Sequence, residues 1–279
     1  MTSIKAKLTA ILASVALAAS LSVPAFAYEQ VEDTVSYGHG YNDAGYLVIH
    51  ETANPGASAY NHTLLWSRDD TFAVHYVMEL DGSVVYHTVP DWALCWHVGN
   101  GNYATVGIEL AHATNWEDFA ARLDEPLGQF IKIYRPNCFD RVGLRFVNAI
   151  SREQLGLTGR RWNDLLQPPY LGILDEDDVD EASVAKCSVD VERKLDTLAA
   201  LKLHAGPGFV QRNIRSGNQV QQVQEKEVRF IFDQDVYSIG KVKVAAVAET
   251  LNALHAHSDS VFSDAITTVL HDAMEPEYL

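Results

Sequence analysis

Basic side chains are scarce in the first half of this sequence. From residue 28 to residue 120 the only lysine or arginine is Arg68, against thirteen aspartates and glutamates, and the 279-residue chain has a formal net charge of −16. Nucleic-acid backbones are bound mainly through lysine and arginine, so nucleic acid is excluded as the expected partner. Seven of the 11 histidines lie before residue 113. This change in composition near residue 120 predicts two segments of different character.

Cysteine is also scarce. Cys95, Cys138 and Cys187 are odd in number and widely spaced, and no two of them form a C-x-x-C pair. The sequence therefore excludes a structural zinc knuckle. One disulfide is compatible with an oxidising compartment, but the spacing does not select the pair.

Only one long apolar run is present, and it lies at the N-terminus. Lys5 and Lys7 precede the apolar residues 8–23, and Ala25-Phe26-Ala27 is an A-x-A cleavage pattern. This order predicts a signal peptide, residues 1–27, removed after Ala27. A membrane anchor would need a longer apolar core. We therefore expect a secreted protein without stable membrane insertion, with an N-terminal domain over 28–120 and a second domain over 121–279.

The segment 46–55 predicts a buried strand that ends in a histidine. The apolar residues 47–49 lead directly into His50, and the pair Asn54-Pro55 ends any regular structure. A histidine at a strand end that faces a loop is well placed to bind a metal or to act in catalysis. The alternative is a histidine bonded to a nearby backbone carbonyl.

An Asp81-Gly82 pair between two β-rich runs, 72–80 and 83–89, predicts a hairpin. Alternation places one set of side chains toward the core: Val74, Tyr76, Met78 and Leu80. His75 falls on the other face. Two interpretations of His75 remain open, a residue that faces a cleft and a polar group that is satisfied inside the protein.

A further loop and strand carry candidate binding and catalytic groups. Trp96 and His97 lie in the glycine-rich loop 92–102, which suits contact with a sugar or peptide, or a loop fixed by a buried tryptophan. In the next predicted strand, 105–112, Glu109 shares a face with Gly107 and the small Ala111. The space above such a carboxylate favours a pocket and a general acid or base.

Four pieces in order and spacing then carry a resemblance: Val48-Ile-His50-Glu-Thr-Ala-Asn-Pro55, Ala73-Val-His75-Tyr-Val-Met-Glu-Leu-Asp-Gly82, Trp96-His-Val-Gly99 and Asn102-Tyr-Ala-Thr-Val-Gly-Ile-Glu109. On these pieces residues 44–118 resemble the zinc-dependent N-acetylmuramoyl-L-alanine amidases, the family that includes phage endolysins and peptidoglycan recognition proteins. The resemblance implies an α/β fold, a mixed sheet with flanking helices. It also implies a cell-wall location, peptidoglycan as partner and hydrolysis of the bond between the muramyl lactyl group and L-alanine.

The resemblance also assigns roles to individual residues. It implies that His50 is the first zinc ligand and that Glu109 is the catalytic carboxylate. The residues that it places along the substrate groove are His75, Trp96, His97 and Asn102. A zinc ion with an open coordination position would activate water, and a carboxylate would move the proton.

The second and third zinc ligands of the family are not evident. His204 has no Asp, Cys or His within ten residues after it, and His112 falls on the strand face opposite Glu109. His255 and His257 do not share a helix face. The sequence thus predicts an incomplete zinc site in a truncated amidase domain. A non-catalytic wall-binding module and an inactive fusion are the alternatives to an active amidase.

The second half predicts an α+β domain of unknown function. Strands are predicted over 140–150 and 228–237, an amphipathic helix over 184–201, and closing helices over 242–254 and 261–274. Asp233 and Asp235 share a strand face, and solvent exposure is favoured over metal binding. Residues 128–279 are similar to an uncharacterised family of sporadically distributed bacterial proteins, through Arg141-Val-Gly-Leu-Arg-Phe-Val-Asn148 and Phe232-Asp-Gln-Asp-Val-Tyr237.

Overall fold

A computed structural model describes residues 29–52, 57–111, 116–216 and 219–274. The chain divides into two compact units, the first ending at Pro136 and the second beginning at Asn137. The expected boundary near residue 120 falls within one helix of the first unit. The expected signal peptide and His112 lie outside the described residues. In the part of the chain that is described, every helix is too short or too polar to cross a membrane.

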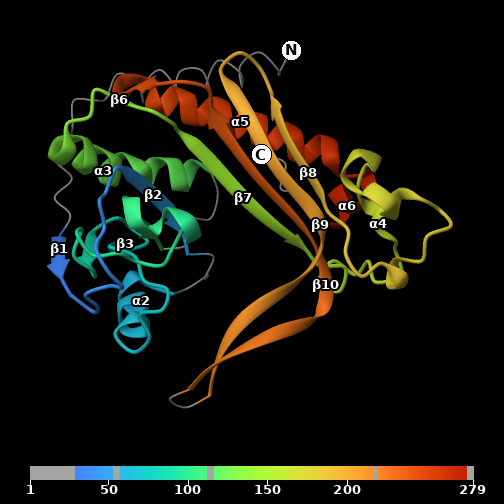
Figure 1. The fold of residues 1–279 in the computed structure, drawn as a ribbon, viewed down its shortest axis with the longest axis horizontal. Coiled ribbons are helices and arrows are strands. Elements are labelled where there is room, and N and C mark those ends of the chain that lie inside the picture. Colours follow the sequence, from blue (N-terminus) through green and yellow to red (C-terminus); the bar gives the residue numbers. More distant parts are fainter. Residues whose placement is uncertain (1–28, 53–56, 112–115, 217–218, 275–279) are drawn as a thin grey trace, which may run out of the picture. The chain divides into compact units, whose positions relative to one another are not determined.

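The first unit is built on a five-stranded mixed sheet in the order β1-β4-β3-β5-β2 (Figure 1). Its strands are β1 (Glu29–Glu32), β2 (Tyr46–Glu51), β3 (Tyr76–Met78), β4 (Val84–His87) and β5 (Thr105–Leu110). Its helices are α2 (Ala59–Trp66), α3 (Trp116–Tyr134) and the 3-10 helix η1 (Gly99–Ala104). Only β3 and β4 pair antiparallel; the other pairs are parallel. The predicted α/β class is confirmed.

Local sequence accounts for several of these elements. Ser58 caps α2, and its side chain accepts from the backbone N–H of Asn61. Gly82 adopts φ 70° in the β3–β4 turn, a conformation that favours glycine. The face predicted to be core is only partly buried: Val74 and Met78 are each 2% exposed, but Leu80 is 45% exposed. His75 and Val77 on the second face are both 0% exposed, because β3 is the central strand of the sheet.

The second unit is an antiparallel sheet in the order β7-β10-β9-β8, with helices against one face. Its strands are β6 (Cys138–Phe139), β7 (Gly143–Ile150), β8 (Val189–Lys194), β9 (Ala199–Ser216), β10 (Gln219–Ser238) and β11 (Val242–Lys243). Its helices are α4 (Trp162–Leu165), η2 (Pro168–Tyr170), η3 (Gly172–Asp175), η4 (Glu181–Ser183), η5 (Val244–Ala246), α5 (Val247–Ala265) and α6 (Thr268–Ala273). Strands β6 and β11 form a separate small ladder.

The two faces of the larger sheet differ. On the inner face Phe230 and Phe232 are fully buried, and Phe232 packs edge-on against Phe262 of α5, with ring centroids 5.6 Å apart. On the outer face Asp233 and Asp235 each bind an arginine at 2.6 Å. The aspartate pair is thus occupied by cross-strand ion pairs.

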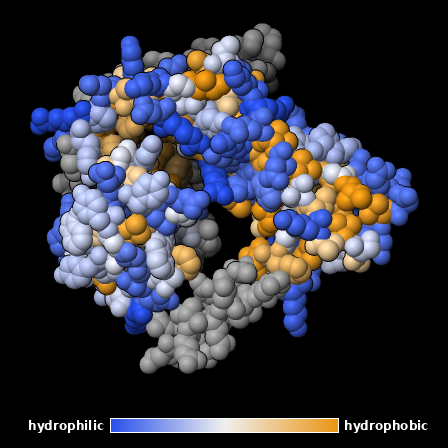
Figure 2. Space-filling model, viewed as in Figure 1, coloured by the Kyte–Doolittle hydropathy of each residue, from blue (hydrophilic) through white to orange (hydrophobic). Residues whose placement is uncertain are grey.

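Elsewhere in this unit, Figure 2 shows apolar surface over the region of α4 and α6.

The expected helix over 184–201 was wrong. The segment forms β8 and the start of β9, which pair antiparallel. Asp196 closes the turn between them by accepting from the N–H groups of Leu198 and Ala199. Apolar residues recur at three- and four-residue intervals here, but residues 189–192 also alternate apolar and charged. Pairing with β9 stabilises the strand, in which side chains alternate with a period of two residues.

Candidate functional site

His50 and Glu109 lie side by side on neighbouring strands. Strands β2 and β5 run parallel, and their register pairs His50 with Glu109. Paired residues leave a sheet on the same face, so the imidazole and the carboxyl group share one side of the sheet. The sequence predicted both residues for the site, but it could not predict this register.

His97 fills the space that the small residues beside Glu109 leave open. A Cβ atom added at Gly107 would lie 2.6 Å from Cε1 and 2.7 Å from Nδ1 of His97. The ring of His97 therefore rests directly on the backbone of β5, which only glycine permits. From there Nδ1 of His97 lies 2.9 Å from Nε2 of His50.

A chain of hydrogen bonds fixes the protons on the two histidines. The hydroxyl of Thr105 donates to the carbonyl oxygen of Gly101 at 3.2 Å, so its oxygen accepts from Nε2 of His97 at 3.0 Å. His97 then carries its proton on Nε2, and its Nδ1 accepts from Nε2–H of His50. The lone pair of His50 is consequently on Nδ1.

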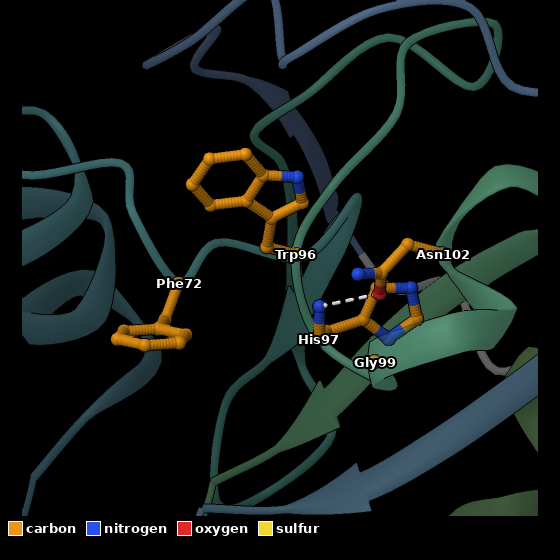
Figure 3. Close-up of a pocket in the computed structure, with 5 residues that line it drawn as sticks. All are labelled: Phe72, Trp96, His97, Gly99 and Asn102. Carbon is orange, nitrogen blue, oxygen red and sulfur yellow. Dashed lines mark hydrogen bonds between the residues drawn. The ribbon is translucent and has the colours of Figure 1, made fainter.

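Asn102 holds the loop that carries His97. Its Oδ1 accepts from the backbone N–H groups of His97 and Val98, at 2.9 and 2.8 Å. The neighbouring Trp96 is 45% exposed, and its ring stacks on that of His39 at 4.1 Å. Together with Phe72 these loop residues surround a pocket of about 380 Å3, lined by Phe72, Trp96, His97, Gly99 and Asn102 (Figure 3).

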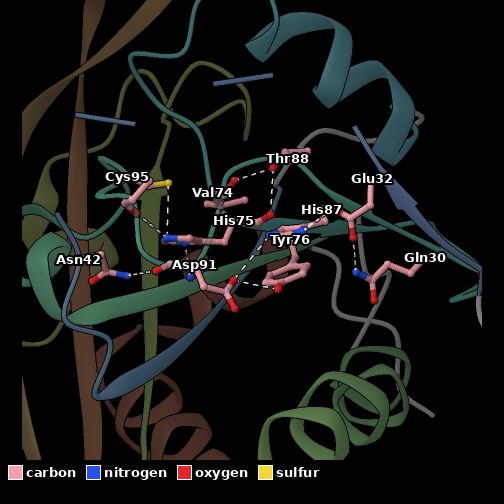
Figure 4. Close-up of polar contacts among 12 residues, drawn as sticks. Gln30, Glu32, Asn42, Val74, His75, Tyr76, His87, Thr88, Asp91 and Cys95 are labelled. Carbon is pink, nitrogen blue, oxygen red and sulfur yellow. Dashed lines mark hydrogen bonds and ion pairs between the residues drawn. The ribbon is translucent and has the colours of Figure 1, made fainter. Parts of the chain in front are cut away.

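His75 does not line this pocket. It is 0% exposed, its Nδ1 accepts from the N–H of Gly107 at 3.0 Å, and its Nε2 donates to the carbonyl of Ala93 at 2.9 Å (Figure 4). The sulfur of Cys95 lies 3.7 Å from the same nitrogen. Both ring nitrogens are thus used inside the protein. We therefore correct the expected substrate contact of His75 to the alternative, a satisfied buried group that supports β5.

A second polar network in the first unit was not predicted. The hydroxyl of Tyr76 donates to Asp91 at 2.8 Å, and its ring stacks on His87 at 4.5 Å (Figure 4). His87 binds Glu32 of β1 through Nδ1 at 2.8 Å, while its Nε2 lies 3.6 Å from Asp91. The residues come from four separate segments, so no sequence spacing signals the network. It ties the N-terminal strand to the sheet.

The pKa shifts of Glu109 and of the two histidines have opposite directions. Burial, followed by the charge of Glu51, raises the pKa of Glu109 to about 8, and its buried Oε2 has no hydrogen-bond partner among the described residues. Burial lowers the pKa of His50. Burial and the two neighbouring histidines lower the pKa of His97 to about 3. Neutral imidazoles thus stand beside a carboxyl group that titrates near neutrality, which suits proton transfer.

The donor set falls short of a catalytic zinc site. Such a site usually takes three protein ligands and keeps one position open. Among the described residues no three histidine, cysteine, aspartate or glutamate side chains gather closely enough to hold a metal ion. His204 and His257 lie in the second unit, where each binds an aspartate. The described residues therefore do not fit the zinc ion that the resemblance implies.

Sequence reasoning missed two residues of the pocket region. Phe72 was assigned only to the start of a hairpin, and His39 was not singled out. Both lie in irregular segments where no periodicity indicates which side chain meets which. The exposure of Phe72, 60%, is the structural sign that sets it apart from the core phenylalanines.

One family of known proteins matches part of the first unit. Residues 40–132, a third of the chain, match the N-acetylmuramoyl-L-alanine amidase family. A search of curated proteins gave no match.

Three solved structures illustrate the likeness. Staphylococcus aureus hydrolase AmiA is 22% identical over 39% of this chain and 58% of that chain, with a TM-score of 0.33, so this chain spans little more than half of AmiA. The amidase LysCS from Clostridium intestinale is 16% identical over 39% and 77% of the chains, with a TM-score of 0.32. The Ph2119 endolysin of a Thermus scotoductus bacteriophage is 22% identical over 37% and 73%, with a TM-score of 0.28. The resemblance of residues 44–118 to the N-acetylmuramoyl-L-alanine amidases is thereby confirmed, within the matched segment 40–132.

Proposed function

We propose that the first unit acts on peptidoglycan and hydrolyses the amide bond between the lactyl group of N-acetylmuramic acid and L-alanine. One observation carries this proposal. In the segment that matches the amidase family, a buried carboxyl oxygen of Glu109, which has no hydrogen-bond partner among the described residues, stands beside His50, one strand away. A buried polar atom without a partner is costly in a folded protein, and such atoms are typical of sites that bind a ligand.

Glu109 is the group that moves protons in this proposal. With a pKa raised to about 8 by burial, its carboxylate form accepts a proton from the attacking water. The protonated form then delivers that proton to the leaving amine nitrogen of L-alanine. His97 stays neutral and keeps the ring of His50 oriented through the Nε2–H to Nδ1 bond. Zinc dependence is a separate question, because the described donors do not complete a zinc site.

The test uses purified chain and purified peptidoglycan, and counts newly formed L-alanine amino groups by dinitrophenylation and mass spectrometry. We expect wild-type protein to release them and Glu109→Gln to lose about 100-fold or more in rate, the usual contribution of a general acid–base residue. Tyr103→Ala, an exposed side chain of η1 outside the pocket lining, is the control and should keep its rate. Equal rates for Glu109→Gln and wild type would refute the assignment.

A second candidate is a wall-binding unit without hydrolysis. The donor set favours it, because both nitrogens of His97 are already hydrogen-bonded and no third ligand joins the pair in the part of the chain that the structure describes. In this case the protein sediments with purified walls, releases no amino groups, and contains no zinc by plasma mass spectrometry. A content of about one zinc per chain, lost in His50→Ala, would instead support the hydrolytic function.

Export is the remaining part of the proposal, and the N-terminal pattern around Ala25-Phe26-Ala27 supports it. Expression in a bacterial host followed by N-terminal sequencing of protein from the medium tests it. We expect the mature chain to begin at Tyr28. A cell-retained protein that still begins at Met1 would contradict export.

A further inference from the structure

The larger sheet of the second unit has two edge strands, β7 and β8, and the β8 edge is protected by charge (Figure 1). The backbone N–H of Leu195, just after β8, donates to the carbonyl of Ala199. In an antiparallel pair every second residue points away from its partner strand, so three residues of β8 direct their backbone groups to the free edge: Asp190, Glu192 and Lys194. All three are charged and exposed. Charged residues on an edge strand hinder pairing with another chain.

The edge of β7 carries a row of open backbone groups. The N–H of Ser238, at the end of β10, donates to the carbonyl of Val142. By the same alternation, the N–H and C=O groups of four residues point away from the sheet: Gly143, Arg145, Val147 and Ala149. Within the described ranges these groups have no backbone hydrogen-bond partner. The strand keeps its register with β10 over all eight residues and contains no proline.

The side chains of β7 leave this edge unprotected. Its one charged residue, Arg145, is already bound to Asp233 of β10 through two nitrogens, at 2.8 and 2.6 Å. Val147, in the middle of the strand, is 58% exposed on the outer face. On the inner face Phe146 is only partly buried, although Leu144 is buried. A regular edge strand with exposed apolar side chains and open backbone groups is the kind that pairs with a further strand.

A second copy of β7 fits this edge. With an antiparallel arrangement about a two-fold axis at Val147, the N–H and C=O groups of Val147 bind those of the same residue in the second copy, and Arg145 lies opposite Ala149. An axis at Arg145 would place two arginines opposite each other, so charge favours the axis at Val147. Because β10 already holds β7 extended, joining two copies orders less chain than binding a free peptide would.

We propose that the edge of β7 is a self-association surface, through which two copies of this chain join their second-unit sheets into one continuous sheet. The surface lies in the second unit and does not depend on the chemistry proposed for the first unit. A pair of chains carries two first units. If the first unit acts on peptidoglycan as proposed above, this pairing would strengthen attachment to the polymer, because both units can bind it at once.

Sedimentation velocity of the purified chain over a concentration series measures the association. Pairing along one strand makes a small interface, so we expect a dissociation constant on the order of 10 μM. Val147→Lys and Val147→Glu each place like charges opposite each other at the two-fold axis, and each should weaken association about 10-fold or more. An equimolar mixture of the two variants should restore association, because opposite charges then meet at the axis.

Leu198→Lys is the matched control, because Leu198 is 72% exposed in the turn between β8 and β9 and takes no part in the β7 edge. It should associate as wild type does. Amide hydrogen exchange followed by NMR adds a measurement on the unmodified chain. The N–H groups of Arg145, Val147 and Ala149 should become protected as the protein concentration rises, whereas that of Phe146 should be protected at every concentration.

Three results would overturn the inference. The first is wild-type protein that stays monomeric at about 200 μM, twenty times the expected dissociation constant. The second is association that neither Val147 variant weakens, which would place the interface elsewhere. The third is a mixture of Val147→Lys and Val147→Glu that associates no better than either variant alone, since the two-fold axis at Val147 requires the charges to meet.

Discussion

The two units use histidine in opposite ways. In the first unit His50 and His97 bind each other, half-buried and without a carboxylate partner in that contact, and burial lowers the pKa of both rings. In the second unit His204 and His257 each bind an exposed aspartate. Surface pairs of the second kind contribute little stability and tolerate change. Buried histidines with shifted pKa values occur more often at functional sites than surface ion pairs do, so this contrast supports the candidate site in the first unit.

The two units also differ in the type of apolar side chain that they expose. Among the described residues of the first unit, nine of the twelve large exposed apolar side chains are aromatic, and the other three are Leu64, Leu65 and Leu80. The aromatic ones are Tyr37, Tyr41, Tyr46, Tyr60, Phe72, Trp92, Trp96, Tyr103 and Tyr134. The large exposed apolar side chains of the second unit are mostly aliphatic: Val147, Ile173, Leu198, Phe209, Ile239 and Met274. Aromatic side chains offer large rigid contact surfaces, and they are enriched where proteins bind ligands. The described part of the first unit therefore exposes more aromatic side chains than that of the second unit.

The largest expected effect is on the stability of the second unit, and it tests whether burial of the core side chains stabilises this unit. Phe232 is 0% exposed and contacts the rings of Tyr170 and Phe262. We expect Phe232→Ala to lower the free energy of unfolding of this unit by about 3–5 kcal/mol, measured by urea unfolding. Phe209→Ala, at a 51% exposed site, is the control and should change it by less than about 0.5 kcal/mol. Similar losses for both variants would contradict a core-based unit.

The next largest effect is expected at the close contact between the ring of His97 and Gly107 in the first unit. In Gly107→Ala the new Cβ meets the ring of His97 at 2.6 Å, so the ring must leave its place on β5. We expect a loss of about 1–3 kcal/mol in unfolding free energy. The imidazole NMR signals of both His50 and His97 should also shift. Gly45→Ala, where a Cβ meets nothing within 4 Å, should leave both unchanged.

Much of the site is visible in the sequence, because its pieces are local. The sequence patterns of β2 and β5 and the Asp81-Gly82 pair each predict a local element. His50 and Glu109 were predicted as site residues from their positions in these strands. The place of His97 was not predictable, because it depends on a loop folding back over Gly107. The helix expected over 184–201 failed for a related reason. Pairing with β9 decided the conformation there, and such pairing is a long-range effect that spacing does not report.

A smaller effect concerns the network that ties β1 to the sheet. Asp91 and Glu32 raise the pKa of His87, while the nearby imidazole of His87 and the hydrogen bond from Tyr76 outweigh burial and lower the pKa of Asp91. The contribution of His87 is fully present below its unfolded pKa, about 6.5, and is lost as pH rises through the raised value. The contribution of Asp91 is lost as pH falls through its lowered value.

Urea unfolding of wild type and His87→Gln over a pH series measures this contribution. We expect a difference of about 1 kcal/mol near pH 5, shrinking as the pH rises above the raised pKa of His87. A variant in the second unit, His204→Gln, is the comparison, since its imidazole is half-exposed and bound to an exposed aspartate. A difference for His87→Gln that grows with pH would contradict the sign of the shift.

The smallest effect concerns the outer face of the second sheet. Arg145 binds Asp233 through two nitrogens, at 2.8 and 2.6 Å, but the arginine side chain is 65% exposed. Solvent screens such a pair, so a double-mutant cycle of Arg145→Met and Asp233→Asn should give a coupling of about 1 kcal/mol or less. Added salt should reduce it further. A coupling of several kcal/mol would contradict the expectation that this face is an ordinary solvated surface.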